Sequence, residues 1–132
     1  MRVFALPQVM RLLRKERLPD TLLCAAAREV LAGRLGMGEA DLGGGLWKKR
    51  LARPGSGKSG GYRAIVAYRR PRSDRVLFAF VFAKNAAATL TPAGHEALAK
   101  SAGAFVGTTD AQLGALLEAG DVREVRCDGG EG

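Results

Sequence analysis

Three segments rich in β-forming residues, joined by short links, constrain the fold of this chain more than any other feature. The segments are 46–53 (LWKKRLAR), 62–69 (YRAIVAYR) and 75–83 (RVLFAFVFA), and the last is a nearly continuous apolar run typical of a central strand. The links 54–61 and 70–74 are short and rich in turn-forming residues. Strands joined in this way pair with their neighbours in sequence, so we predict an antiparallel meander.

Two helices are predicted before the sheet. From Pro7, apolar residues recur at helical spacing, with basic residues on the reverse face. Pro19 and Asp20 then supply a second start signal, and a second apolar stripe continues to Gly33, which can end the helix. We expect these helices to be antiparallel. The glycine-rich stretch 33–45 is interpreted as a loop, and 1–6 as either a strand or an irregular lead-in.

Helices are also predicted after the sheet. Thr91 before Pro92 has the arrangement of a helix start, and Thr109 with Gln112 forms a capping box for a last short helix that ends at Gly120. The fold class is therefore α+β: two N-terminal helices, an antiparallel sheet of three to four strands, and C-terminal helices.

The length of 132 residues suits one domain. We place it at 1–126, with a core of about 8–100, a C-terminal helical extension at 101–126, and a disordered tail at 127–132. Cys24 and Cys127 lie far apart and in no metal-ligand spacing, so neither a disulfide nor a zinc site is predicted, and a reducing cytoplasm is the default. The longest apolar run, eight residues from Val76, is too short for a membrane helix, and no signal peptide is evident.

The positive charge is concentrated in the middle of the chain. The net charge is +8, yet the segment from Asp110 onward contains six acidic residues and only two arginines. Between Asp41 and Asp74 there is no acidic residue and there are nine basic ones, interleaved with Trp47, Tyr62 and Tyr68. A polyanion crossing this stretch would compensate the charge, and the aromatic rings could stack on bases. The pattern predicts a surface that binds a phosphate backbone.

Two nucleotide-binding motifs in this stretch are rejected. Residues 52–59 (ARPGSGKS) resemble a P-loop, and the glycines 55, 57 and 60 fit GxGxxG. A P-loop needs an apolar strand before it and a helix after it, whereas here the flanks are basic and strand-like. The segment is interpreted as a hairpin connection, and no nucleotide or other cofactor is expected.

Strand periodicity gathers the basic residues into a candidate cluster. A period of two places Lys48 and Arg50 on one face of their strand, with Trp47 and Leu51 on the other. Arg63 shares a face with alternate residues of the next strand, but the sequence does not fix the register that would bring it to Lys48 and Arg50. The predicted cluster comprises Lys48, Arg50, Arg53, Arg63 and Lys84.

Here the chain resembles the RelE-like toxins of bacterial toxin-antitoxin systems, within the RelE/ParE superfamily. The resemblance covers about residues 8–100 and is carried by EADLGGGLWKKR (39–50), ARPGSGKSGGYR (52–63) and FAKN (82–85), in family order and spacing. It implies a small α+β toxin that cuts messenger RNA, often on the ribosome, with a cognate antitoxin protein as partner. Lys48, Arg50 and Arg63 match basic positions of the family's active site.

Cleavage by the 2'-hydroxyl needs a base, cations on the phosphate, and an acid for the leaving oxygen. The planar guanidinium grips phosphate, so Arg50 and Arg63 are predicted to stabilise the transition state. Like charges disfavour a protonated lysine, which makes Lys48 the first choice of base, with Lys84 and Tyr68 as weaker ones. With no carboxylate cluster to hold magnesium, no metal is expected. Further RNA contacts are assigned to Lys49, Arg53, Lys58, Tyr68 and Arg69, although an ordinary solvated charge is the better explanation of Lys49 and Lys58.

The chain departs from the family pattern after Asn85. Charged residues commonly follow there, whereas this chain has Ala86, Ala87 and Ala88. Two other functions therefore stay open: a non-catalytic relative that binds nucleic acid or a protein target such as gyrase, and a DNA-binding partner in autoregulation. Nothing in the sequence reads as a recognition helix for the latter.

Overall fold

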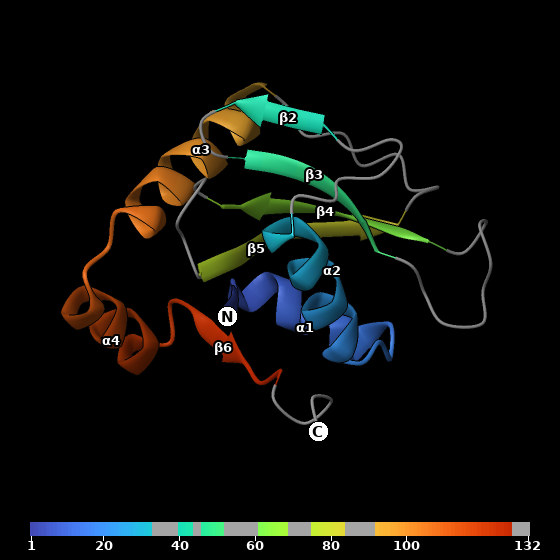
Figure 1. Ribbon diagram of the computed structural model, residues 1–132, viewed down its shortest axis with the longest axis horizontal. Helices are drawn as coiled ribbons and strands as arrows, with labels where there is room; N and C mark the ends of the chain where they lie inside the picture. Colours follow the sequence, from blue (N-terminus) through green and yellow to red (C-terminus); the bar gives the residue numbers. More distant parts are fainter. Residues whose placement is uncertain (33–39, 44–45, 52–60, 69–74, 84–91, 128–132) are drawn as a thin grey trace.

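A six-stranded sheet with the order β2-β3-β4-β5-β1-β6 forms the centre of the computed structural model (Figure 1). The structure describes residues 1–32, 40–43, 46–51, 61–68, 75–83 and 92–127. Its strands are β1 (Arg2–Ala5), β2 (Ala40–Gly43), β3 (Leu46–Leu51), β4 (Tyr62–Ala67), β5 (Arg75–Ala83) and β6 (Arg123–Val125). Its helices are α1 (Pro7–Lys15), α2 (Thr21–Leu31), α3 (Pro92–Val106) and α4 (Asp110–Ala119). The predicted α+β class is confirmed.

The predicted meander is present, but the sheet is larger and mixed. Strands β3, β4 and β5 pair antiparallel in sequence order. Strand β1 then pairs with β5 in parallel, β6 pairs antiparallel with β1, and β2 adds to the free side of β3. The expectation of three to four antiparallel strands was therefore wrong. Strand β1 lies in residues 1–6, which the sequence left open as a strand or an irregular lead-in. Strands β2 and β6 have only four and three residues, which is too short for a periodic pattern to reveal them.

Helices α1 and α2 cover one face of the sheet. Val9 and Leu13 of α1 and Leu23 of α2 are almost completely buried against it, together with Val66 and Phe78 from the strands. In Figure 1 the two helices lie in front of the sheet. We call this side the α1/α2 face.

Helices α3 and α4 supply the apolar side chains on the other face. Phe105 of α3 packs edge-on against Phe4 of β1, with ring centroids 5.3 Å apart, and Leu113 of α4 is buried in the same cluster. Leu46 of β3 and Ile65 of β4 also belong to it. We call this side the α3/α4 face.

The end signals of the last helix are confirmed. The Thr109 side chain accepts a hydrogen bond from the Gln112 amide, the Gln112 side chain accepts one from the Thr109 amide, and Gly120 ends α4 in a left-handed conformation with φ 78°. Pro92 begins α3, while Thr91 and Gly33 lie outside the described residues. None of the helices in the described part of the chain is long and apolar enough to cross a membrane.

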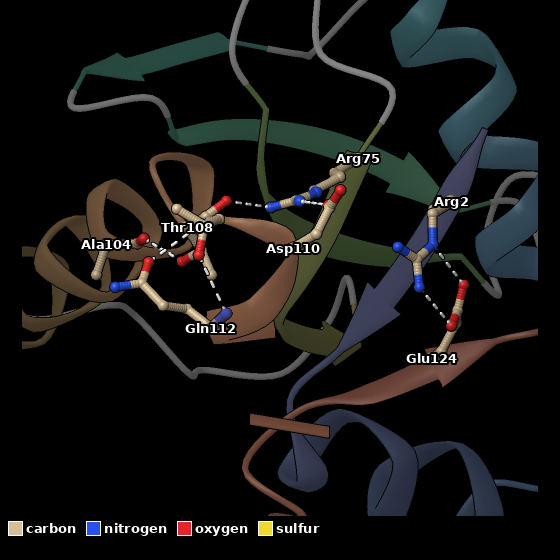
Figure 2. Close-up of polar contacts among 8 residues, drawn as sticks. Arg2, Arg75, Ala104, Thr108, Asp110, Gln112 and Glu124 are labelled. Carbon is tan, nitrogen blue, oxygen red and sulfur yellow. Dashed lines mark hydrogen bonds and ion pairs between the residues drawn. The ribbon is translucent and has the colours of Figure 1, made fainter. Parts of the chain in front are cut away.

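Ion pairs attach the acidic C-terminal segment to the sheet (Figure 2). Arg2 of β1 donates two hydrogen bonds to the Glu124 carboxylate of β6, each 3.0 Å long. At the start of β5, Arg75 donates to the Thr108 carbonyl over 2.7 Å and pairs with Asp110. Two of the late acidic residues thus compensate arginines at one end of the sheet.

The structure corrects the interpretation of the two cysteines. Cys24 of α2 and Cys127, two residues after β6, form a disulfide with a Cα–Cα distance of 5.5 Å. The sequence separation of 103 residues hides this proximity, because only the folded chain brings the segment after β6 to α2, where Arg28 donates a hydrogen bond to the Cys127 carbonyl. Cys127, the first residue of the tail predicted at 127–132, is therefore joined to α2, and residues 128–132 lie outside the described part of the chain.

We predict that removing the disulfide lowers stability. Cross-linking a loop of about 100 residues restricts the unfolded chain, and disulfides typically contribute about 2–4 kcal/mol. Cys127→Ser should therefore unfold at lower urea concentration than the oxidised wild type, followed by circular dichroism. Reductant should lower the wild-type stability to the variant's value and leave the variant unchanged. A wild type insensitive to reductant would contradict the prediction.

The Arg2–Glu124 pair predicts a pH dependence. The hydrogen bond from Arg2, the charge of Arg2 and that of Arg126 hold the pKa of the Glu124 carboxyl below its ordinary value of 4.5. Because this pKa is lower in the folded state, the ionised Glu124 carboxylate stabilises the fold above pH 4.5. The stabilisation is lost as the pH falls through the pKa of the folded state. Because both side chains are more than a third exposed, Glu124→Gln should cost no more than about 1 kcal/mol at pH 7. Thermal unfolding should show this difference shrinking in acid; a constant difference would refute it.

Candidate functional site

The pairing of β3 with β4 brings three predicted cations to the α3/α4 face. Arg50 lies directly opposite Arg63, and Lys48 lies opposite Ile65. Residues directly opposite in an antiparallel pair point to the same side, and Ile65 belongs to the apolar cluster of the α3/α4 face. Lys48, Arg50 and Arg63 therefore share one face of the sheet. We call these three residues the basic cluster.

The environment of the basic cluster favours an anionic ligand. Arg50 is exposed, whereas Lys48 and Arg63 are half-buried. Like charges directly opposite one another destabilise a sheet. The Nη1 atom of Arg63 is buried and, among the described residues, has no hydrogen-bond partner. A buried charged donor without an acceptor is costly, and a phosphate oxygen would satisfy it.

A β-bulge in β5 places two aromatic rings beside the basic cluster. Ile65 pairs with Phe80 and Val66 pairs with Phe78, so Ala79 is an extra residue in β5. The Ala79 carbonyl accepts a 3.3 Å hydrogen bond from the Gln8 side chain of α1. Beyond the bulge, Phe80 and Phe82 join the margin of the α3/α4 cluster, and Phe82 lies opposite Arg63. The sequence does not mark either ring as a site residue, because a continuous apolar run carries no sign of a bulge.

Lys49 occupies the opposite face. It is only 3% exposed and pairs with Glu29 of α2. The expectation of an RNA contact, and the alternative of a solvated charge, both conflict with this burial. Alternation along β3 is the cause, since Lys49 lies between Lys48 and Arg50 and must point away from them.

The tyrosines also lie on the α1/α2 face. Tyr68 is 6% exposed and belongs to the core, so its predicted RNA contact and its candidacy as a base conflict with its position. The Tyr62 hydroxyl donates a 2.7 Å hydrogen bond to Glu16, the residue that directly follows α1. Trp47 packs against the same core, as its alternation with the cations predicted.

Four predicted site residues lie outside the described part of the chain: Lys84, Arg53, Lys58 and Arg69. Ala86, Ala87 and Ala88 also lie there. Over the described ranges, no group of three or more His, Cys, Asp or Glu side chains could hold a metal ion.

Comparison with known proteins gives one family. The family described as RelE toxin of the RelE / RelB toxin-antitoxin system matches residues 1–125. No curated protein matches the chain. The match runs from β1 to the last residue of β6 and so includes every strand and helix described above.

The Lys49–Glu29 pair yields an asymmetric prediction. Glu29→Gln leaves a buried ammonium group without its carboxylate, and hydrogen bonds to charged groups contribute about 1.5–3 kcal/mol. Lys49→Met removes the buried charge together with its need for a partner and keeps an unbranched apolar chain, so its cost should be smaller. Urea unfolding of both variants measures the difference. A larger loss in Lys49→Met than in Glu29→Gln would contradict this account.

Proposed function

Because the chain belongs to the RelE toxin family, we propose that this toxin of a toxin-antitoxin pair is an endoribonuclease that cuts messenger RNA on the ribosome. The observation that carries the proposal is the basic cluster, three cations on one face with the Nη1 atom of Arg63 buried and unpartnered among the described residues. Such a group suits the non-bridging oxygens of a phosphodiester.

The proposed reaction is transesterification within the RNA strand. A base takes the proton of a 2'-hydroxyl, the oxygen attacks the adjacent phosphorus, and the bond to the 5'-oxygen breaks, which leaves a 2',3'-cyclic phosphate and, after proton transfer, a 5'-hydroxyl. Negative charge grows on the phosphate oxygens during attack, and fixed cations stabilise this transition state more than the ground state. All the atoms of the products come from the RNA and its protons, so the step needs no cofactor.

Each member of the basic cluster receives a role. Arg63 and Arg50 stabilise the charge on the phosphate, Arg63 through its half-buried guanidinium and Arg50 from the exposed side. Lys48 is the proposed base, because it lies two residues from Arg50 on the same strand face. Lys84 is kept as a further catalytic candidate, and Arg53, Lys58 and Arg69 as RNA contacts, from the sequence alone. Lys49 and Tyr68 are left out of the proposed surface because they are buried on the other face.

The proposed partners are a cognate antitoxin, messenger RNA and the ribosome, all in the cytoplasm. The family itself implies an antitoxin. An antitoxin that blocks activity by covering the basic cluster would need acidic groups, because it would contact the same three cations that bind the RNA phosphates in this proposal. The alternative is a relative without nuclease activity that acts on gyrase or another target.

Mutation of Arg63 tests the proposal. Arg63→Ala should abolish growth arrest on expression and lower cleavage in vitro by about 100-fold or more, as loss of one electrostatic donor commonly does. Arg63→Lys keeps the charge but loses the bidentate fork, so partial activity is expected. Arg14→Ala removes an exposed cation of α1 on the other side of the sheet and is the matched control.

Transcript end mapping after induction distinguishes the two functions. A nuclease creates new 5' ends in messenger RNA, and the proposed transesterification predicts that these ends carry a 5'-hydroxyl. Broken DNA without new RNA ends would favour the gyrase alternative. Full toxicity in Arg63→Ala would refute the role of the basic cluster.

A further inference from the structure

We infer that Phe80 and Phe82 form a stacking surface for a nucleobase next to the phosphate bound by the basic cluster. The inference rests on the proposed function for the identity of the ligand, since it assigns a single-stranded RNA nucleotide to this face. It adds a contact to the base, whereas the basic cluster contacts only the backbone.

The two rings differ in exposure from the other phenylalanines. Phe4 and Phe78 are 0% exposed and Phe105 is 3% exposed, as expected of core residues. Phe80 and Phe82 are half-buried, and their centroids lie 5.6 Å apart with an interplanar angle of 34°. Of the five phenylalanines in the chain, the two that reach solvent thus lie side by side.

The rings lie within reach of the phosphate site. Phe82 is directly opposite Arg63, and Phe80 is opposite Ile65, which in turn is opposite Lys48. Neighbouring strands are about 4.8 Å apart, and an arginine side chain is longer than this step. A base stacked on Phe82 would therefore leave its own phosphate close enough for Arg63 to hold. Alternating cations and aromatic rings are the arrangement by which proteins bind single strands without reading sequence.

The bulge at Ala79 is what brings the rings to this face. Leu77 belongs to the α3/α4 cluster and Phe78 to the α1/α2 core, so strict alternation would send Phe80 and Phe82 under α1 and α2 as well. The extra residue reverses this, and the Gln8 side chain satisfies the displaced Ala79 carbonyl. Bulges recur next to active sites, where they redirect a side chain. If Phe80 and Phe82 served only to fill the core, they could pack on the α1/α2 face and no bulge would be needed.

Binding of two labelled oligonucleotides tests the inference independently of cleavage. The first is a single-stranded 2'-O-methyl RNA, which lacks the attacking hydroxyl and stays intact. The second has the same backbone charge but an abasic sugar at every position. Fluorescence anisotropy at low salt should show that the wild type binds the RNA more tightly than the abasic strand.

Substitution of the rings should remove this preference. Phe80→Leu with Phe82→Leu should weaken RNA binding by about tenfold, within the range that base stacking contributes, and leave the affinity for the abasic strand unchanged. Phe82→Trp keeps an aromatic ring and should retain the preference. Phe105→Leu makes the same chemical change in the core of the α3/α4 cluster and should alter neither affinity; circular dichroism verifies that each variant is folded.

Three results would overturn the inference: equal wild-type affinity for both strands, an equal loss for both strands in the double leucine variant, or a Phe82→Trp variant that loses the preference. Cleavage of unmodified RNA is measured separately with Arg63→Ala. A base-dependent affinity without cleavage would refute the nuclease function and leave the stacking surface standing, whereas cleavage without base-dependent affinity would do the reverse.

Discussion

The register between β3 and β4 is the constraint on which the site depends. Arg50 opposite Arg63 brings the basic cluster together, and this register is held by burial on both faces. Leu51 and Tyr62, opposite each other, are buried on the α1/α2 face, while Leu46 and Ala67 are buried as a pair on the α3/α4 face. A slip of one residue would turn every side chain of β3 over and send the cations into the core.

The same strands carry two opposing demands. The core requires apolar residues at alternate positions, and the proposed chemistry requires three cations between them. Lys49, the fourth cation of these two strands, lies on the α1/α2 face instead, where it forms an ion pair with Glu29 of α2. In the basic cluster, the buried Nη1 atom of Arg63 has no hydrogen-bond partner among the described residues, and an incoming phosphate oxygen could accept a hydrogen bond from it.

The sequence predicted those features that have a local period. Alternation predicted the meander and the faces of Lys48, Arg50 and Arg63, and capping residues predicted α4 and its end. Features created by distant pairing were not predicted: the sequence left residues 1–6 open as a strand or an irregular lead-in, and it gave no sign of β6, which pairs with β1, or of the parallel pairing of β1 with β5. The register of β3 on β4, the burial of Lys49 and the bulge at Ala79 likewise depend on which side chains the packed sheet can accommodate. The disulfide was missed for the same reason, since the two cysteines become neighbours only in the folded chain.

The position of the Cys24–Cys127 bond has a consequence for fragments of this protein. It encloses every connection between α2 and the end of β6, including all of the segments that hold the basic cluster. A protease that nicks any one of these connections would produce two pieces that stay covalently joined. The nicked protein would migrate as a full-length chain on a gel until the disulfide is reduced. Before reduction, its mass would exceed that of the uncut protein by one water molecule.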